Sequence, residues 1–353
     1  MAIITNTYQS TSGASKQNRE IIIRDTIERV DPSETPLFSM IGRAPNIDGV
    51  DPKWVQSSLA TPDPNNAQVE GDQYTFTAIN QPARVGNYTQ IFWRTFAVSD
   101  SQNELLKVGP KTEVGRNRME KGLELRTDIE VSMLSNNASV GGLTRKSAGL
   151  RAWTATNDVF SAGGASGGFN AGTGLVTAAT NGTNQRAFTK ALMDAALLAT
   201  YTAGGNPTLC ILSPYAKSVF SSFMSDANVA QLRMPTSPKS QATLVGAADA
   251  YLSDWGLIDF VPDRQMARVG AALARNVFFI TPDKLEKGFF RDIQEDTDLA
   301  SNADAELFVL KCEFALIDRH EKAHGVVADI WGMTSASWPL GADSPCLSGA
   351  GGV

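Results

Sequence analysis

The sequence predicts an α+β fold organised around one long helix, and three stretches support this prediction. Residues 111–137 form a proline-free stretch with charges along its whole length, which predicts a helix about 37 Å long at about 1.5 Å per residue. Residues 306–331 begin with alternating apolar and polar side chains, as a long strand with one buried face does. Residues 50–103 are rich in β-branched and aromatic residues with Pro and Gly between them, which predicts a two-stranded β excursion with an irregular tip.

The predicted helix over residues 111–137 has the features of a spine for the subunit. Opposite charges at i,i+4 predict the ion pairs Arg116–Glu120 and Arg126–Glu130. Its apolar residues recur at helical spacing on neighbouring stripes, and they are Met119, Leu123, Leu125, Ile129 and Met133. An ordinary core helix has the same pattern. The strand predicted within residues 306–331 has the length needed to cover this helix.

Composition limits the class of protein. The chain has 353 residues, 42% of them hydrophobic, and a net charge of −6 from 31 basic and 37 acidic residues. No basic domain or stripe of the kind that grips nucleic acid is present. With no run of about 18 apolar residues and no secretory signal pattern, we expect no membrane partner and synthesis in the cytoplasm. Three widely spaced cysteines, Cys210, Cys312 and Cys346, predict neither a disulfide framework nor a metal cluster.

The N-terminal stretch predicts an arm and two short helices. Residues 1–17 are small and polar without a period, as in a flexible or partner-ordered arm. Residues 19–30 predict an amphipathic helix. Thr35 and Pro36 then suit the cap and first residue of a second helix that includes residues 37–41, which is too short to be stable without packing on another element.

The β excursion is predicted to need a surface to lie on. Its two expected strands span residues 53–59 and 87–99, and both carry aromatic side chains. Two strands alone are marginal in water, and exposed aromatic side chains are costly. We therefore expect the excursion to lie on another surface, such as a second subunit; the alternative is a hairpin folded back on its own core.

The second half of the chain predicts a lobe that mixes helices and strands. A long loop rich in Gly, Ala, Ser and Thr precedes it, and its glycines match no phosphate-binding motif. Acid-rich residues 292–304 predict an exposed turn. The expected helices cover residues 186–202 and 213–224, and the expected strands cover residues 207–212, 243–253, 257–261 and 276–280.

One motif suggests enzyme chemistry. His320, Glu321 and His324 spell H-E-x-x-H, which on a helix binds zinc and activates water. Here strand alternation precedes the motif, Gly325 follows it, and no third His or Glu ligand lies downstream. We therefore expect a turn or bulge within the strand system. A zinc hydrolase remains only as a weak alternative, and we expect no catalytic residue, no metal and no cofactor.

Several spaced segments together resemble the major capsid proteins of tailed bacteriophages. The resemblance runs in order from about residue 20 to residue 331 and so covers most of the chain. The segments that carry it are DPSETPLFSMIG (31–42), VEGD (69–72), RVGNYTQI (84–91), GLELRTDIEVSMLSNNASVGG (122–142), TAGGNP (202–207), VGAADAYLSDWG (245–256) and AHGVVADI (323–330).

This resemblance implies the HK97-like capsid fold. The arm before the first helix is short, so we expect no large cleaved N-terminal region. Lys53 is the sole lysine between residues 42 and 106, and we expect no covalent cross-link. The implied parts are an N-terminal arm (1–45), an E-loop that lies over a neighbouring subunit (46–104), a peripheral domain (105–203, with the spine helix 111–137 and a glycine-rich loop 160–185), an axial domain (204–299), peripheral strands (300–331) and a C-terminal tail (332–353).

The resemblance also implies a function. It predicts a structural, non-enzymatic protein that self-assembles through hexamers and pentamers into the icosahedral shell of a virion. The shell would enclose double-stranded DNA without sequence-specific binding, with portal and scaffolding proteins as partners and a decoration protein as a further candidate. An encapsulin-like shell that holds cargo enzymes is the alternative within this fold. The expected contact residues of the E-loop are Trp54, Tyr88, Phe92, Trp93 and Arg94.

Overall fold

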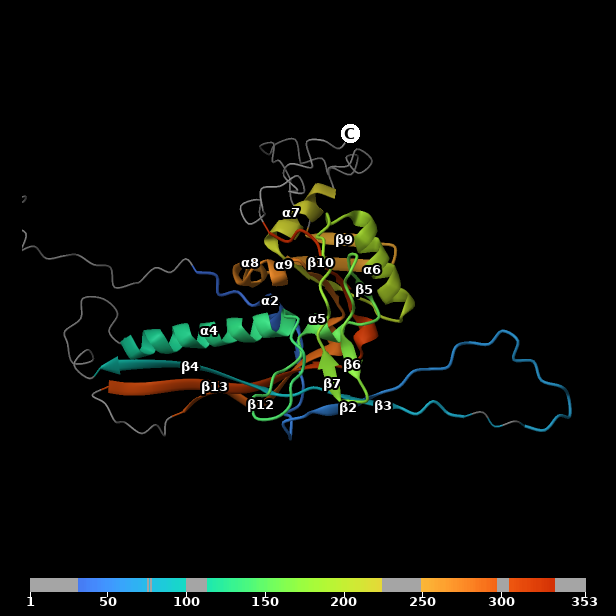
Figure 1. Ribbon diagram of the computed structural model, residues 1–353, viewed down its shortest axis with the longest axis horizontal. Coiled ribbons are helices and arrows are strands. Elements are labelled where there is room, and N and C mark those ends of the chain that lie inside the picture. The colour runs from blue at the N-terminus through green and yellow to red at the C-terminus, as the bar shows by residue number, and fades with distance from the viewer. Residues whose placement is uncertain are drawn as a thin grey trace, which may run out of the picture.

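The computed structural model combines an elongated body, a compact lobe and one long excursion (Figure 1). It describes residues 31–74, 76, 78–99, 113–223, 249–296 and 305–333. The mixed α+β class is confirmed. The predicted arm, the helix over residues 19–30 and the C-terminal tail from residue 334 lie outside the described residues.

The elongated body is one long helix on one sheet. The sheet has four strands in the order β1-β12-β13-β4, in which β13 is antiparallel to both of its neighbours and β1 is parallel to β12. Leu125 and Ile129 of the helix are fully buried in one cluster with Phe92 and Phe314 of the sheet, and each such side chain stabilises the fold by about 1.5–3 kcal/mol. The strand therefore covers the helix, as predicted. The elements are α4 (Glu113–Leu134), β1 (Gly42–Arg43), β4 (Gln90–Ser99), β12 (Leu285–Asp296) and β13 (Ala305–Asp318).

Two features predicted for the long helix are wrong. The Arg116–Glu120 pair forms at 2.8 Å, but Glu130 does not pair with Arg126. Glu130 is fully buried and accepts hydrogen bonds from a neighbouring segment, because it lies on the covered side of α4. Met119 was expected in an apolar stripe but is largely exposed, since it lies near the end of α4 that extends beyond the lobe (Figure 1).

Two strand boundaries also differ from prediction. The strand expected over residues 306–331 ends at Asp318, and the chain then enters β14 (Gly325–Val327) of a different sheet. Residues 292–296 were expected in an exposed turn but continue β12, where they pair with β13. Acidic side chains fit there because Lys311 of β13 pairs with Asp296 and Arg43 with Asp292.

The compact lobe surrounds a six-stranded sheet. The strand order is β5-β14-β11-β8-β10-β9. Alternate residues of β8 and β11 face α6 and α7 on one side and α8 and α9 on the other, so both central strands are buried. Thr189 and Ser213 cap α6 and α7 by accepting N–H hydrogen bonds. The bounds are β5 (Asp158–Val159), β8 (Leu209–Leu212), β9 (Ala250–Ser253), β10 (Gly256–Pro262), β11 (Val277–Ile280), α6 (Lys190–Thr202), α7 (Pro214–Ser222), α8 (Arg264–Val269) and α9 (Ala271–Ala274).

These sheets do not coincide with the predicted segment boundaries. The lobe sheet includes β5 and β14, which lie outside residues 204–299, while β12 lies inside that range but pairs in the body. The chain therefore passes between lobe and body more often than the predicted segments imply.

The stretch after α4, predicted as a long loop rich in Gly, Ala, Ser and Thr, contains regular secondary structure. It forms α5 (Leu150–Trp153) and a hairpin of β6 (Gly168–Asn170) and β7 (Leu175–Thr177). Asn136 fixes it by exchanging two hydrogen bonds with the backbone of Ala179, at 2.6 and 2.8 Å. Gly149 lies so close to the carbonyl oxygen of Ser135 that a Cβ would collide. The small residues of this stretch permit close packing of the backbone. A composition rich in such residues is typical of flexible loops as well, so composition alone does not distinguish the two.

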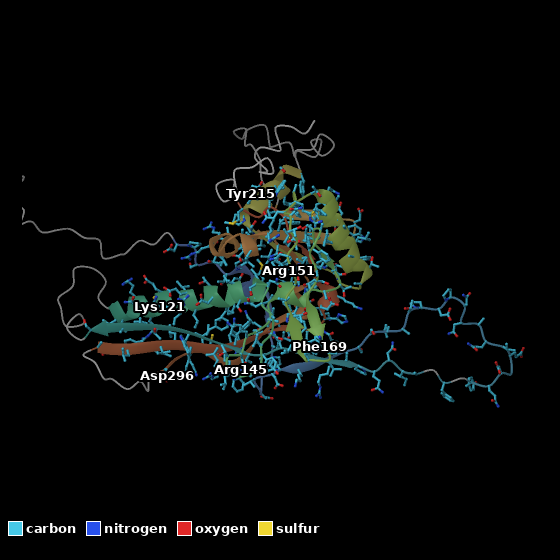
Figure 2. All side chains as sticks on the ribbon, viewed as in Figure 1. Lys121, Arg145, Arg151, Phe169, Tyr215 and Asp296 are labelled. Carbon is cyan, nitrogen blue, oxygen red and sulfur yellow. The ribbon has the colours of Figure 1, made fainter. Side chains whose placement is uncertain are left out.

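Buried charges tie this stretch to the lobe. Arg151 donates to Asp158 at 2.6 Å with both side chains fully buried, and Figure 2 shows Arg151 between the body and the lobe. Asp329 has a φ of 62° and accepts from the backbone N–H of Gly182 at 2.9 Å while pairing with Arg275 at 2.7 Å. Removing one partner of such a pair leaves an uncompensated buried charge, so these contacts fix the junction.

Candidate functional site

The excursion carries an unusual set of exposed apolar side chains. Its base is a hairpin of β2 (Lys53–Gln56) and β3 (Ala83–Gly86), and residues 57–82 project from it away from the body (Figure 1). We call residues 57–82 the tip. Its large apolar side chains are between 74% and 98% exposed, and they are Leu59, Val69, Tyr74, Phe76 and Ile79. Such a set marks an interaction surface.

The base of the excursion, in contrast, is held firmly in its own subunit. Trp54 packs against Trp153, with ring centroids 5.5 Å apart and ring planes tilted by 36°. Asn87, between β3 and β4, is buried; its amide donates to the carbonyl oxygen of Leu316 at 2.8 Å and accepts from the N–H of Ala148 at 2.9 Å. The tip therefore extends from a fixed support.

The pairing within the excursion differs from prediction. The strand expected over residues 87–99 begins at Gln90 as β4, and it pairs with β13 of the body and not with β2. The alternative of a hairpin folded back on its own core holds for the base, while the tip remains uncovered.

The residues predicted to contact a neighbour fall into two groups. Trp54 and Phe92 are each only 9% exposed, and Arg94 makes a bidentate pair with Asp128 of α4 at 2.7 Å. These three side chains are used mainly inside the subunit. Tyr88 is half-buried, while Trp93 is 68% exposed. Trp93 is thus the strongest of these candidates for a contact between subunits.

Trp93 belongs to an open face on the side of the sheet opposite α4. Alternate residues of β4 share this face, and the register places Leu307 of β13 opposite Ala97. Ile91, Trp93 and Leu307 are exposed large apolar residues. We call this surface the open sheet face, and its residues are Ile91, Trp93, Thr95, Ala97 and Leu307. Leu307 was not among the contact residues predicted from the sequence, although the alternation of residues around it indicates an exposed position.

An ion cluster borders the open sheet face. Glu313 lies opposite Ile91 in the register and accepts hydrogen bonds from Thr89 at 2.6 Å, Arg145 at 2.8 Å and Arg291 at 2.9 Å. Burial alone would raise the pKa of Glu313, but these hydrogen bonds outweigh it and lower the pKa. In Figure 2 Arg145 lies on the side of the sheet away from α4. The cluster places fixed charges beside apolar surface.

The H-E-x-x-H string forms no catalytic arrangement. It lies in a short 3-10 turn, Glu321–Ala323, between β13 and β14, so a turn is confirmed. The His320 ring accepts from the Lys322 N–H, the Glu321 carboxylate accepts from Thr156, and buried His324 faces Asp318 at 3.4 Å. Within the described residues, no group of three or more His, Cys, Asp and Glu side chains is placed to hold a metal ion.

A second apolar surface lies on the lobe. Leu252 of β9 and Leu257 of β10 face each other across the edge hairpin of the six-stranded sheet and are both exposed. Strand β9 is the edge of that sheet, a position at which another chain can pair.

In the part of the chain that the structure describes, no helix is long and apolar enough to cross a membrane.

A long helix over a sheet, a lobe and an extended loop together define the class of shell proteins with the HK97-like fold. A cyanophage A-1(L) capsid structure is similar over 89% of this chain and 98% of its own, with a TM-score of 0.58 and 14% identity. The holo-SrpI encapsulin of Synechococcus elongatus PCC 7942 is similar over 90% of this chain and 94% of its own, with a TM-score of 0.52 and 11% identity. At these identities the likeness shows the fold alone.

The family follows from the sequence comparison. The family model described as the SU10 major capsid protein matches residues 3–331. The major capsid protein of Escherichia phage Phieco32 is 26% identical over 249 residues, which cover 62% of this chain and 70% of that protein. The chain belongs to the SU10 major capsid protein family. It is a phage major capsid protein, a structural subunit that forms the icosahedral shell.

Proposed function

We propose that copies of this subunit assemble through hexamers and pentamers into a head shell, with the tip of each copy lying over the open sheet face of a neighbour. The observation that carries the proposal is the exposed apolar set on the tip. Burying each of these side chains contributes about 1.5–3 kcal/mol, and every copy repeats the contact. Linked weak contacts of this kind lock a lattice through effective concentration.

The open sheet face suits the tip as a partner. Trp93 and Ile91 supply an aromatic and an aliphatic surface, and aromatic anchors commonly dominate protein interfaces. A subunit's own tip projects away from its own sheet (Figure 1), so the contact joins two copies. Among the residues expected to contact a neighbour, Trp93 carries most of this role, with Tyr88 at its border and Trp54, Phe92 and Arg94 as supports.

In this proposal each part of the subunit has the role of the corresponding part of the HK97-like fold. Residues 46–104 act as the E-loop, and the body built on α4 acts as the peripheral domain that tiles the shell. The lobe acts as the axial domain that closes five- and six-fold rings, and its exposed edge, with Leu252 and Leu257, is the surface for the ring neighbour.

The proposed shell encloses double-stranded DNA without sequence-specific contacts. A net charge of −6 fits a container that confines DNA and does not neutralise its phosphates one by one. The subunit acts without catalysis or cofactor. Portal and scaffolding proteins are the further partners in the proposed assembly, with a decoration protein as an additional candidate, after synthesis in the host cytoplasm.

A cargo compartment like the encapsulins is the second candidate within this fold, and the likeness to the SrpI encapsulin favours it. The family match and the curated relative, both phage capsid proteins, favour the virion. DNA inside shells isolated from infected cells would support the virion, whereas a packaged enzyme would support the compartment.

Electron microscopy of the purified protein tests the proposal. We expect the wild-type chain to form closed shells, and a variant with Tyr74→Ser, Phe76→Ser and Ile79→Ser to remain as folded free subunits or isolated rings. Met119→Ser, which changes a largely exposed apolar residue outside both surfaces, is the control and should assemble. Normal shells from the tip variant would contradict the proposed contact.

A further inference from the structure

One turn of the tip carries two acidic side chains. It spans residues 69–72, and the N–H of Asp72 closes it by donating to the carbonyl oxygen of Val69 at 3.2 Å. Gly71 supplies a φ of 82° at the third position of the turn, which residues with a Cβ rarely adopt. Glu70 and Asp72 lie on either side of this glycine, and both are exposed. We call residues 69–72 the acidic turn.

The charge of the whole tip has one sign. Residues 57–82 contain three acids, which are the two of the acidic turn and Asp63, and they contain neither Lys nor Arg. Three negative charges and no positive charge give the tip a net charge of −3. A surface of this kind is steered toward a basic partner surface and repelled by an acidic one.

The open sheet face has an excess of positive charge at one end. There the buried carboxylate of Glu313 accepts from Arg145 at 2.8 Å and from Arg291 at 2.9 Å, and both arginine side chains reach the solvent. Within the described part of the chain, no other acid pairs with either guanidinium group. Lys146, the next residue after Arg145, is exposed. Three bases around one acid leave a local net charge of +2. We call Arg145, Lys146 and Arg291 the basic cluster.

The other charges near the basic cluster cancel in pairs. Asp292 pairs with Arg43 at 2.9 Å, and Asp296 pairs with Lys311. Lys311 lies opposite Trp93 in the register, so this neutral pair belongs to the middle of the open sheet face. The excess of positive charge is therefore confined to the end of the face beside Ile91.

Charge and apolar surface follow each other at similar spacing on the two surfaces. Along β4 the basic cluster comes first, because Glu313 lies opposite Ile91, and Trp93 follows two residues later, about 7 Å away at about 3.3 Å per residue. Along the tip the acidic turn comes first, and Tyr74 and Phe76 follow it at about 7 and 13 Å of extended chain. A tip whose acidic turn lies at the basic cluster can thus place its aromatic side chains on Trp93.

We propose that the acidic turn of one copy binds the basic cluster of its neighbour and so fixes the position and direction of the tip on the open sheet face. The inference rests on the contact between tip and open sheet face proposed above, and it adds the polar determinant of that contact. Apolar side chains supply most of the binding free energy, whereas complementary charges exclude a shifted or reversed tip. Exposed ion pairs are weak and are screened by salt, so the contact should depend on ionic strength.

Assembly of the full-length chain at different salt concentrations tests the proposal. Glu70→Gln combined with Asp72→Asn removes both charges of the acidic turn with little change in volume, and the exposed tip leaves the fold of the subunit unaffected. Sedimentation gives the protein concentration at which shells first form. We expect this concentration to be severalfold higher for the variant at about 0.05 M sodium chloride and to approach that of the wild type at about 1 M, where the screening length is about 3 Å.

Asp63→Asn is the matched control for the acidic turn. It removes one acid of the same tip, outside the turn, and Asn can still accept the hydrogen bond that Asp63 accepts from the N–H of Asn65. We expect this variant to keep the salt dependence of the wild type. An effect as large as that of the neutral turn would mean that net charge matters and that the acidic turn has no partner of its own.

A double-mutant cycle locates the partner of the acidic turn. Arg145→Gln removes one charge of the basic cluster and keeps a donor for Glu313, whereas Arg145→Lys keeps the charge and should assemble as the wild type does. If the acidic turn meets Arg145, the neutral turn and Arg145→Gln together should weaken assembly less than the product of their separate effects. Arg268→Gln, at an exposed base of α8 in the lobe, should show no such coupling.

Several outcomes would overturn the proposal: a neutral turn that assembles with the salt dependence of the wild type, or separate effects that simply multiply in the cycle. If Arg145→Gln does not fold, Lys146→Gln, at an exposed side chain, replaces it in the cycle. Failure of the whole contact would look different, because the variant with Tyr74→Ser, Phe76→Ser and Ile79→Ser would then form normal shells. If that variant does not assemble while the neutral turn behaves as the wild type, the tip contact holds and only its polar determinant is wrong.

Discussion

Helix α4 and the tip of the excursion both carry recurring large apolar residues, but they use them differently. In α4, Leu125, Ile129 and Met133 are fully buried in the subunit's own core. In the tip, Tyr74 and Phe76 are more than 90% exposed. One region is complete within a single chain, whereas the other still has its apolar surface in water.

This difference separates two kinds of stability. Side chains of α4 set the free energy of unfolding of one subunit, and those of the tip and the open sheet face set the free energy of joining subunits. A substitution in the first region should affect the subunit and the shell, but one in the second should affect the shell alone. The following variants test this separation, from the largest effect on the subunit to the smallest.

Leu125→Ala should have the largest effect on the subunit. It removes a fully buried side chain from the contact between α4 and the sheet and should cost about 2–5 kcal/mol of unfolding free energy. Urea unfolding of the unassembled subunit measures this. Met119→Ala, on the same helix but exposed, should stay within about 0.5 kcal/mol. Equal losses from both would mean that α4 has no buried stripe.

Asn87→Ala should have the next largest effect, because it acts where the excursion joins the body. It leaves the carbonyl of Leu316 and the N–H of Ala148 without their partner, which costs about 1–3 kcal/mol. Urea unfolding gives the cost, with Gln68→Ala in the exposed tip as a control that should be silent. A silent Asn87→Ala would show that the base does not depend on this residue.

The fold could be predicted in outline because its long elements have clear periods. The spacing of Leu125, Ile129 and Met133 and the alternation in β13 specify one helix and one strand that cover each other. The fate of Glu130 could not be read from its sequence neighbours. Arg126 at i−4 predicts an exposed ion pair. In the structure the backbone N–H groups of Leu37 and Phe38, distant in the sequence, donate to the Glu130 carboxylate instead.

The contact surface could be predicted only in part for a related reason. Aromatic content placed Trp54, Phe92 and Trp93 together, but burial depends on which strand faces which. Strand β4 pairs with β13 and not with β2, so Phe92 points to the core and Trp93 to the open face. Alternation within β4 contains this information, whereas the pairing that decides which face is covered involves a strand more than two hundred residues away.

Glu313→Gln should change the acid limit of the subunit. The pKa of Glu313 is lowered in the folded state, so its contribution is complete above its unfolded value of about 4.3 and is lost as pH falls through the lower folded pKa. The variant should lose stability at neutral pH and lose less on acidification than the wild type. Thermal melts across pH measure this, with Glu286→Gln, in the exposed pair with Arg319, as the control.

Trp93→Ser should have the smallest effect on the subunit and a large one on the shell. The indole is mainly in solvent, so its removal should change the unfolding free energy by no more than about 0.5 kcal/mol. If a neighbour's tip covers it, the loss recurs at each contact of the lattice, and even about 1.4 kcal/mol per contact is a tenfold change in its equilibrium constant. Sedimentation should then show folded subunits where the wild type shows shells. A destabilised Trp93→Ser subunit would mean that Trp93 stabilises its own chain. Normal shells would mean that Trp93 makes no important contact between subunits.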